Sequence, residues 1–500
     1  MAIMGLDIGT TGSKAVVFDL DGTILSSSYR EYNLISPKPG WLELSPNDVL
    51  YAVKAVVSEA KENSNAHIQS IALSTLGEAA IPVDKTGKPL ANAIIGFDPR
   101  GEAQCKKFRR LIDPIELFNI TGHSANSFHT LFKLMHIREN QPKLFAQIDK
   151  FLCFGDFIAA QLGLPATIDY SMASRTLMFD VNNLNWSDKI ISLAKLDADM
   201  LAKPAAPGTI IGEIGTNELE FPKGAILATG LHDQPAGILG AGIAPGESML
   251  ATGTVVCLGV LLNRTVNAKI MTENNLCKYP TFGNNFINIA WNFTGGSALK
   301  WFRDNLAPDI VKQAESEGKD PYEIITANIP DKPSRLILLP YFTTTGTPYL
   351  DSQASGILMG LRLDINRFDI ARAIMEGVAY ELRVNQELLS QADVEINMYK
   401  AIGGAAKSEI WMQIYANILN RPIAILQTTE CAAWGVALLG AHASGLLRDL
   451  PDILARKIAK TGKRFEPNEK VSLHYDKRMK IYSRLYRKNK SLLHSITKLK

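Results

Sequence analysis

The stretch from Gly5 to Thr23 reads GLDIGTTGSKAVVFDLDGT, and its alternation of apolar and glycine-rich segments decides the fold. Residues 3–8 and 14–19 are short apolar runs separated by GTTGS, a pattern that predicts two antiparallel strands joined by a tight turn. A third apolar run begins at Thr23, directly after DLDG. The chain is therefore expected to begin with three consecutive strands, followed by a helix over residues 46–63, where apolar residues recur at helical spacing.

The first turn carries groups that suit a phosphate. The backbone amides of a Gly9-Thr10-Thr11 turn can converge on phosphate oxygens, and both threonine hydroxyls can donate as well. Asp7 stands at the end of the preceding strand, where it could hold Mg²⁺ through water, and Lys14 adds positive charge. The alternative is an ordinary hairpin turn, and the stretch contains no Walker loop.

A second phosphate signature overlaps the first. The segment DLDGT, Asp19 to Thr23, is similar to the nucleophile motif of haloacid-dehalogenase-type phosphatases, with Asp19 as the nucleophile. Such a site also needs a downstream acidic pair, and the candidate segment GDFIAAQ at 155–161 lacks the second acid. Asp21-Gly22 is a favoured hairpin pair, so DLDGT is interpreted as the turn between the second and third strands.

The opening pattern returns near the middle of the chain. SMLATGTVVCLGV, residues 248–260, is again an apolar run, a Gly-Thr turn at Gly253-Thr254 and a second apolar run. Duplication of such a unit predicts two similar lobes that close on one nucleotide. With the glycine- and proline-rich region at 205–250 as the junction, we expect domains at 1–245 and 246–500.

Composition excludes several classes of function. The 500 residues are 46 % hydrophobic and 21 % charged with a net charge of +3, which offers no electrostatic argument for nucleic acid or a membrane surface. No apolar run reaches the roughly 18–20 residues of a membrane span. Five dispersed cysteines and an amino terminus unlike a signal peptide predict a cytoplasmic protein. The basic segment after Asp476 is expected to form a packed amphipathic helix rather than a nucleic-acid arm, with Ile481, Leu485, Leu492 and Leu493 on its apolar face.

Three later stretches could carry chemistry. In GLHDQPAG, residues 230–237, Asp233 follows an apolar run and could accept a proton from a hydroxyl, or it could simply cap a helix that has Pro235 at its start. GGAAKSEIW, from Gly403, offers two glycines for close approach of a ligand, or an ordinary strand–helix turn. The long polar loop at 341–361 is expected to be functional rather than packed.

Taken in order, these pieces resemble the FGGY family of carbohydrate kinases over nearly the whole chain. FHTLFKLMHIREN, residues 128–140, fits one family signature with Lys133 in place, although His136 stands where the family usually has Trp. GILMGLRLDINRFDIARAIME, residues 356–376, fits the other signature throughout. The resemblance implies an α/β protein of two actin-like (ribonuclease H-like) lobes, with ATP and a sugar in the cleft between them. Many such kinases dimerise, and a homodimer is a possible assembly.

The resemblance also implies a role for individual residues. Asp233 becomes the general base, with Gln234 beside it on the sugar, and Asp7 (through water) and Asp233 hold Mg²⁺. The residues implied in ATP binding are Gly9, Thr10, Thr11, Lys14, Gly253, Thr254, Gly296, Gly404 and Ser408. A catalytically silent nucleotide- or sugar-binding relative would be expected to lose Asp233, which is present here.

The expected sugar pocket departs from familiar members. Where xylulokinases have Met-His this chain has Gly77-Glu78, and the glutamate resembles glycerol kinases, whose preceding Arg is absent. GFDPR keeps Asp98 and Arg100 of a Trp-x-Asp-x-Arg motif but has Gly96 in place of Trp. We expect a polyhydroxylated substrate bound through Glu78, Asp98 and Asp233: a ketose such as xylulose, a related pentulose or a polyol. The alternative substrate is an aldonate such as gluconate, whose charge Arg100 could offset. The alternatives to sugar contact are a surface position for Glu78 and a plain turn at Asp98-Pro99.

Overall fold

The computed structural model describes residues 1–262, 265–427, 430–448 and 461–499. These residues form two compact units. The first comprises Met1–Gly242, Cys277–Ile287 and the described residues from Glu430 to 448, and the second comprises the remaining described residues. The chain passes from the first unit to the second after Gly242. Two later segments, Cys277–Ile287 and the one that begins at Glu430, belong to the first unit again. Among the described residues, no helix is both long and apolar enough to span a bilayer.

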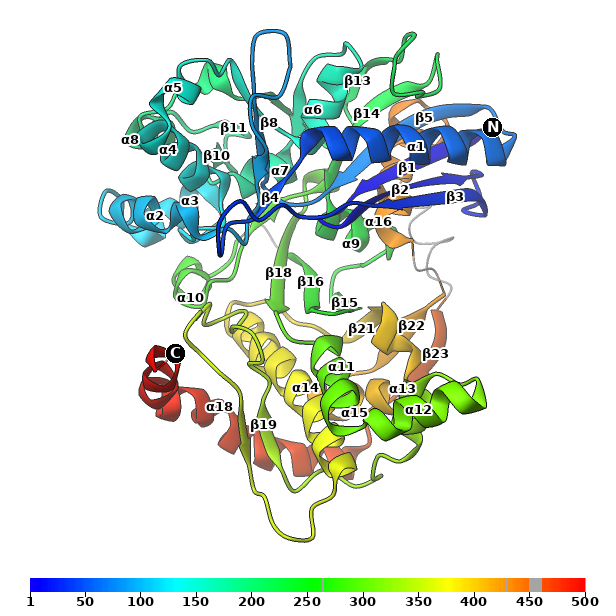
Figure 1. Ribbon diagram of the computed structural model, residues 1–500, viewed down its shortest axis with the longest axis vertical. Coiled ribbons are helices and arrows are strands. Elements are labelled where there is room, and N and C mark those ends of the chain that lie inside the picture. The colour runs from blue at the N-terminus through cyan, green and yellow to red at the C-terminus, as the bar shows by residue number, and fades with distance from the viewer. Residues whose placement is uncertain (263–264, 428–429, 449–460, 500) are drawn as a thin grey trace. The chain divides into compact units, whose positions relative to one another are not determined.

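The first unit is built on a six-stranded mixed sheet in the order β3-β2-β1-β5-β14-β13 (Figure 1). β1 and β2 pair antiparallel from Ile3↔Phe18 to Ile8↔Ser13, while β5 and β14 run parallel to β1. The opening meander expected from the sequence is confirmed. The strands are β1 (Ala2–Ile8), β2 (Gly12–Phe18), β3 (Ile24–Glu31), β5 (Ile68–Thr75), β13 (Ile210–Glu213) and β14 (Ile226–His232).

DLDG forms the turn between β2 and β3, as predicted. Oδ1 of Asp19 accepts hydrogen bonds from the backbone N–H groups of Asp21 (2.9 Å) and Thr23 (2.8 Å). These bonds hold the carboxylate within an exposed turn. The phosphatase interpretation therefore gains no support from the geometry.

Smaller elements surround this sheet in the first unit. Short strands form a four-stranded sheet, two two-stranded pairs and the β17 edge: β4 (Glu43–Leu44), β6 (Ala80–Val83), β7 (Ala93–Ile94), β8 (Lys150–Cys153), β9 (Thr167–Asp169), β10 (Phe179–Asp180), β11 (Asn185–Trp186), β12 (Lys203–Ala205) and β17 (Tyr279–Pro280). The helices are α1 (Pro46–Ser64), α2 (Glu102–Phe108), α3 (Pro114–Thr121), α4 (Thr130–Asn140), α5 (Pro142–Phe145), α6 (Phe154–Gln161), α7 (Tyr170–Arg175), α8 (Asp188–Ala194), α9 (Asp233–Gly240) and α16 (Cys431–Ala443).

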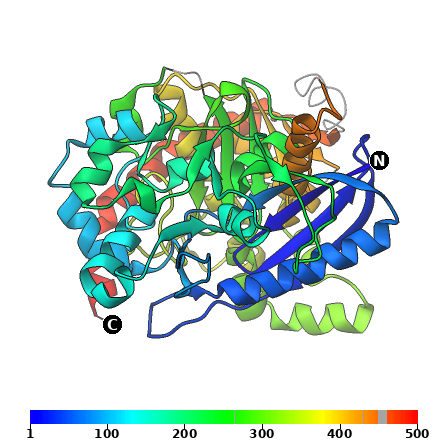
Figure 2. The same cartoon turned by 90° about the horizontal axis from the view of Figure 1, so that it is seen from above.

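Two helices far apart in the sequence cover the sheet. α1 packs on β2 and β3 and lies alongside them in both views (Figures 1 and 2); Ser45 caps its start by accepting the Asp48 N–H. α16 packs on β1, β5 and α9. A Cβ atom added at Gly5 would lie 1.9 Å from the carbonyl oxygen of Ala433, so the helix touches the strand backbone directly.

The second unit repeats the same sheet topology. Its strands lie in a seven-stranded sheet of order β17-β18-β16-β15-β21-β22-β23. In this sheet β15 and β16 pair antiparallel, β21 and β22 run parallel to β15, and β23 is an antiparallel edge. The duplication expected from the echo at 248–260 is therefore present. The strands are β15 (Glu247–Thr252), β16 (Val256–Leu262), β18 (Phe286–Asn292), β19 (Ile337–Leu339), β20 (Ile357–Met359), β21 (Met398–Ile402), β22 (Ile423–Leu426) and β23 (Thr461–Phe465). The helices are α10 (Ala268–Glu273), α11 (Gly296–Leu306), α12 (Pro308–Glu317), α13 (Pro321–Ala327), α14 (Arg367–Gln391), α15 (Glu409–Leu419) and α18 (Glu469–Lys498).

The basic carboxyl-terminal segment forms the amphipathic helix α18, but part of its expected apolar face is wrong. Leu485 and Leu493 are buried, whereas Ile481 and Leu492 are more than half exposed. The buried face is instead completed by four large side chains, Tyr475, Met479, Tyr482 and Tyr486. Tyrosine can be buried where its hydroxyl finds a partner, and here Tyr482 and Tyr475 donate to Glu381 and Glu376 on α14.

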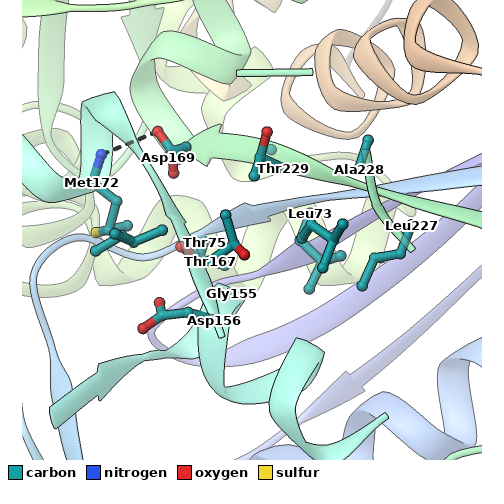
Figure 3. A pocket seen from close by; sticks show the side chains of 13 residues that line it. Leu73, Thr75, Gly155, Asp156, Thr167, Asp169, Met172, Leu227, Ala228 and Thr229 are labelled. Atoms are coloured by element: carbon teal, nitrogen blue, oxygen red, sulfur yellow. Dashed lines mark hydrogen bonds between the residues drawn. The ribbon is translucent and has the colours of Figure 1, made fainter. Parts of the chain in front are cut away.

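A small cavity of about 20 Å³ lies under the first sheet, next to two buried carboxyl groups (Figure 3). Burial raises the pKa of Asp156 to about 8 and that of Asp169 to about 6. Asp156 accepts the N–H of Cys153 at the start of α6, and Asp169 caps α7. Asp156 therefore holds a proton at neutral pH in the folded protein.

This burial predicts how stability depends on pH. Between about pH 4 and pH 8 the folded state holds a proton on Asp156 that the unfolded state lacks, so stability falls as pH rises. Asp156→Asn mimics the protonated form and should flatten this slope. Urea unfolding at pH 5, 6, 7 and 8 measures it, and equal slopes in the variant and the parent protein would contradict the assignment.

Candidate active site

The phosphate-loop residues are held by a tight hairpin turn between β1 and β2. The Gly9 N–H donates to the Gly12 carbonyl at 2.9 Å, and the Tyr32 hydroxyl donates to the Gly9 carbonyl at 2.6 Å. Alternation along β1 places Asp7 on the same face as Ile3 and Gly5, the face that α16 covers. Oδ1 of Asp7 accepts the Ser74 hydroxyl at 2.6 Å.

Several charges gather around Asp7. Burial, reinforced by the carboxylates of Asp233 and Glu430, raises the pKa of Asp7 to about 6, against the opposing effects of Ser74 and Lys14. Lys14 pairs with Glu430 at 3.0 Å. An excess of carboxylate over cationic charge suits a hard divalent cation. Within the described part of the chain no three His, Cys, Asp or Glu side chains form a group that could hold a metal ion by themselves.

Asp233 stands where a strand becomes a helix. β14 ends at His232, which occupies the cap position, and Asp233 is the first residue of α9, so the carboxylate is not the helix cap. Its side chain is 34 % exposed, and its Oδ1 lies 3.0 Å from Nε2 of His232. Burial tends to raise the pKa of Asp233, but His232 and the Gln234 N–H together hold it below its ordinary value. The carboxylate is thus ionised and free to act as a base.

Glu78 is buried, so the surface alternative does not hold. Its side chain is 8 % exposed, and its backbone φ of +44° lies in the left-handed region that non-glycine residues seldom adopt. Its Oε2 accepts Nε of Arg175 at 2.6 Å and also bonds Nη2 of the same residue. Arg175 was missed by sequence reasoning, since nothing in YSMASRTLMF singles it out.

Gly96, which stands where the family motif has a tryptophan, does not border an empty space. A Cβ atom added at Gly96 would lie 2.5 Å from Oε1 of Glu78. The glutamate carboxylate therefore occupies the volume next to this glycine. The pocket is reshaped, with a polar acceptor beside the position where xylulokinases carry an aromatic wall.

Asp98 and Arg100 face each other rather than open space. The Asp98 carboxylate accepts the N–H groups of Leu42 and Arg100 and two guanidinium donors of Arg100, and its side chain is inaccessible. Arg100 also pairs with Glu43 at 2.7 Å and lies 4.2 Å from the centre of the Trp41 ring. The segment is thus more than a plain turn, because the Asp98–Arg100 pair holds its loop in place. In the observed arrangement the Asp98 carboxylate is fully occupied and is not free to bind a sugar.

The second unit contains a pocket of about 680 Å³, which falls in the range of about 300–1,000 Å³ usual for ligand sites. All five residues expected there by sequence line it: Gly253, Thr254, Gly296, Gly404 and Ser408. The turn after β15 and the start of α11 are tied together, because the Gly296 N–H donates to the Gly253 carbonyl at 2.9 Å. Residues that sequence reasoning missed also line it: Lys300, Tyr322, Glu323, Lys407 and Trp411.

Comparison with known proteins agrees with this architecture. Residues 2–240 match the N-terminal domain, and residues 249–444 the C-terminal domain, of the FGGY family of carbohydrate kinases. A xylulose kinase of Staphylococcus epidermidis is 25 % identical over 499 residues, covering 98 % of this chain and 97 % of the relative. A glycerol kinase of Janthinobacterium sp. is 30 % identical over 487 residues, covering 93 % and 94 %. The fold matches the ligand-bound xylulose kinase of Lactobacillus acidophilus with a TM-score of 0.90 at 23 % identity, covering 99 % of both chains.

Fold and sites together define an α/β phosphotransferase of the actin-like class, with two units of like topology, as expected from the sequence. The chain belongs to the FGGY family of carbohydrate kinases. It is an ATP-dependent kinase whose substrates are a carbohydrate and ATP, which sets aside the non-catalytic alternative.

The Glu78–Arg175 pair predicts a large stability effect. Arg175→Met would leave the Glu78 carboxylate buried without its cation, at a cost of about 3–5 kcal/mol. Adding Glu78→Gln to that variant should recover much of the loss, because the unpaired charge is then gone. Urea unfolding of both single variants and the double variant measures the coupling, and purely additive losses would contradict a direct pair.

Two neighbouring glycines, Gly403 and Gly404, provide a matched pair of variants for testing whether ATP binds in the pocket of the second unit. Gly403 has φ +97°, and a Cβ there would lie 2.6 Å from the Thr252 carbonyl, so Gly403→Ala should destabilise the fold. Gly404 lines the pocket with nothing within 4 Å of an added Cβ. Gly404→Val should therefore raise KM for ATP with little change in thermal stability. An unchanged KM for ATP would show that nucleotide does not bind against this glycine.

Proposed function

We propose that this kinase transfers the γ-phosphate of ATP to a hydroxyl of a small ketose or polyol, with Asp233 as the general base. One observation carries the proposal. Oε1 of Gln234 is buried yet has no hydrogen-bond partner among the described residues, and Oδ1 of the adjacent Asp233 lies 3.0 Å from the His232 ring without a regular hydrogen bond. Buried acceptors are normally satisfied, so the unpartnered Gln234 oxygen beside the Asp233 carboxylate points to a ligand that supplies a donor. Sugar hydroxyls are such donors.

The charges around the pocket favour a neutral polyhydroxylated substrate. Oε1 of Glu78, beside Gly96, is an acceptor for hydroxyl groups, and Arg175 provides donors. Both arginines of this region are already paired, Arg175 with Glu78 and Arg100 with Asp98 and Glu43. An aldonate such as gluconate would bring a carboxylate to a place where both arginines already pair with carboxylates. Xylulose or a related pentulose or polyol is thus the preferred substrate class.

The chemistry follows from these positions. Asp233 accepts the hydroxyl proton as the oxygen attacks phosphorus, and phosphoryl transfer otherwise depends on in-line positioning and charge neutralisation. The amides of Thr10 and Thr11 suit the phosphates in the first unit, whereas the Gly9 amide closes the turn onto the Gly12 carbonyl. The pocket lined by Gly253 and Gly404 suits the nucleoside in the second unit. Asp7, with Asp233 nearby, would hold Mg²⁺, which when bound neutralises phosphate charge.

The decisive experiment is a substrate panel. Purified protein is assayed for ADP formation with ATP and Mg²⁺ against ketoses, polyols and aldonates, and we expect turnover with one ketose or polyol. Asp233→Asn, which keeps the shape but not the basicity, should lower kcat by about 10²–10⁴-fold.

The binding measurement separates catalysis from recognition. Calorimetry should show the chosen sugar bound by Asp233→Asn with a Kd within about threefold of the parent value. Near-parental turnover in Asp233→Asn would remove this residue as the base. Turnover with gluconate but no ketose or polyol would overturn the substrate class.

A further inference from the structure

The ring of His232 is the feature of this site that no role yet covers. It is the last residue of β14, its side chain is 8 % exposed, and its Nε2 lies 3.0 Å from Oδ1 of Asp233. We propose that His232 is a positioning residue for the base: its Nε2–H holds Oδ1 of Asp233, so that the other carboxylate oxygen takes the substrate proton. The inference rests on Asp233 being the base, as proposed above.

The partners of the ring fix which nitrogen carries the proton. A carboxylate can only accept, so the nitrogen facing Asp233 has to be Nε2–H. The Tyr279 hydroxyl lies 3.3 Å from Nδ1. Burial raises the pKa of Tyr279 far above its ordinary value, so the phenol keeps its proton and can donate it to Nδ1. An imidazole with Nε2–H toward Asp233 and Nδ1 toward the Tyr279 hydroxyl satisfies both neighbours at once.

The backbone of His232 is anchored independently of its ring. Its N–H donates to the Ser171 hydroxyl at 3.0 Å, and that hydroxyl donates to Oδ1 of Asp169 at 2.5 Å. Asp169 is itself bound at the start of α7, where it accepts the Ser171 and Met172 N–H groups. The end of β14 is thus tied to α7, which fixes the backbone position from which the His232 ring projects.

A glycine makes room for the ring. A Cβ atom added at Gly77 would lie 2.9 Å from Nε2 of His232, closer than real side chains allow. The position at which this chain lacks the arginine of glycerol kinases is therefore the space beside the His232–Asp233 contact. Arg175, Asp169, His123 and Asp7 are further charged or titratable neighbours of this pair.

His232 and Asp233 are close together, but their hydrogen-bond geometry is not yet regular. Oδ1 of Asp233 lies at ion-pair distance, yet it is a buried acceptor without a regular hydrogen bond. Catalytic hydrogen bonds are often loose without substrate and tighten in the Michaelis complex. Substrate binding is therefore expected to complete the His232–Asp233 bond.

The test compares His232→Ala with His232→Gln, using the sugar identified by the panel. Gln offers an N–H near the place of Nε2, whereas Ala offers none. For His232→Ala we expect kcat to fall about 10- to 100-fold, the usual range for loss of a supporting partner, with KM for sugar and ATP nearly unchanged. His232→Gln should restore most of the lost kcat. Tyr279→Phe, which loosens the ring without removing it, should fall between the parent protein and His232→Ala.

Each outcome decides the inference. Equal kcat in the parent, Ala and Gln proteins would overturn it, and so would a raised KM for sugar at unchanged kcat, which would make His232 a substrate contact. If His232→Ala fails to fold, Gly77→Ala takes its place, since it should lower kcat by displacing the ring. Asp233→Asn is measured in parallel, because near-parental turnover there defeats the proposed base itself rather than its positioning.

A second readout needs no substrate. The chain has eight histidines, and with ¹⁵N-labelled imidazoles the His232 signals are assigned as those lost in His232→Gln. Two-bond ¹H–¹⁵N spectra should show Nε2 protonated and Nδ1 accepting. The opposite tautomer, with Nδ1 protonated, would overturn the proposal.

Discussion

The first unit depends on direct backbone contact between α16 and the elements beneath it. A Cβ atom at Gly435 would lie 2.1 Å from the Ala236 carbonyl, and one at Gly240 would lie 1.8 Å from the Cys431 carbonyl. At these crossings and at Gly5, only glycine allows the backbones to meet. Because the helix is seated this deeply, its first turn brings Glu430 to Lys14 and to the Asp7 carboxylate. The electrostatics of the phosphate loop therefore depend on a residue more than four hundred positions away.

Both units are built on the same arrangement of strands. Each has an antiparallel hairpin flanked by parallel strands, and in each a glycine turn follows the first strand of the hairpin. In the first unit the turn lies beside carboxylates that suit a metal-bound phosphate; in the second it lines a pocket of nucleotide size. Two like folds thus carry different chemistry, since the residues after the parallel strands differ: Asp233 after β14, and the Gly403-Gly404 turn after β21.

The sequence predicted the hairpins and their duplication because both are encoded by local patterns, whereas the glycines and Ser408 that line the pocket of the second unit were implied by the resemblance to a family. Strand alternation and glycine turns can be recognised within some twenty residues, as in Gly5–Thr23. The residues around Asp233 could not be recognised from such a pattern. Arg175 and Tyr279 lie in segments with no motif, and they meet Glu78 and His232 only through the packing of α7 and β17. Asp98 was expected to contact the sugar, yet its carboxylate is taken up by Arg100 of the same turn and by the Leu42 N–H of a distant loop, whose Glu43 also binds Arg100.

By itself, then, the sequence determined the class of fold, the phosphate turns and the presence of Asp233, since each is a short pattern with a local physical cause. Only the tertiary structure decided which charges are free. It pairs Arg100 with Asp98 and Arg175 with Glu78, sets His232 beside Asp233, and leaves Oε1 of Gln234 without a partner among the described residues. The reason is that pairing depends on which side chains burial brings within a few ångströms, and that is fixed by long-range contacts such as that of α16 with β1.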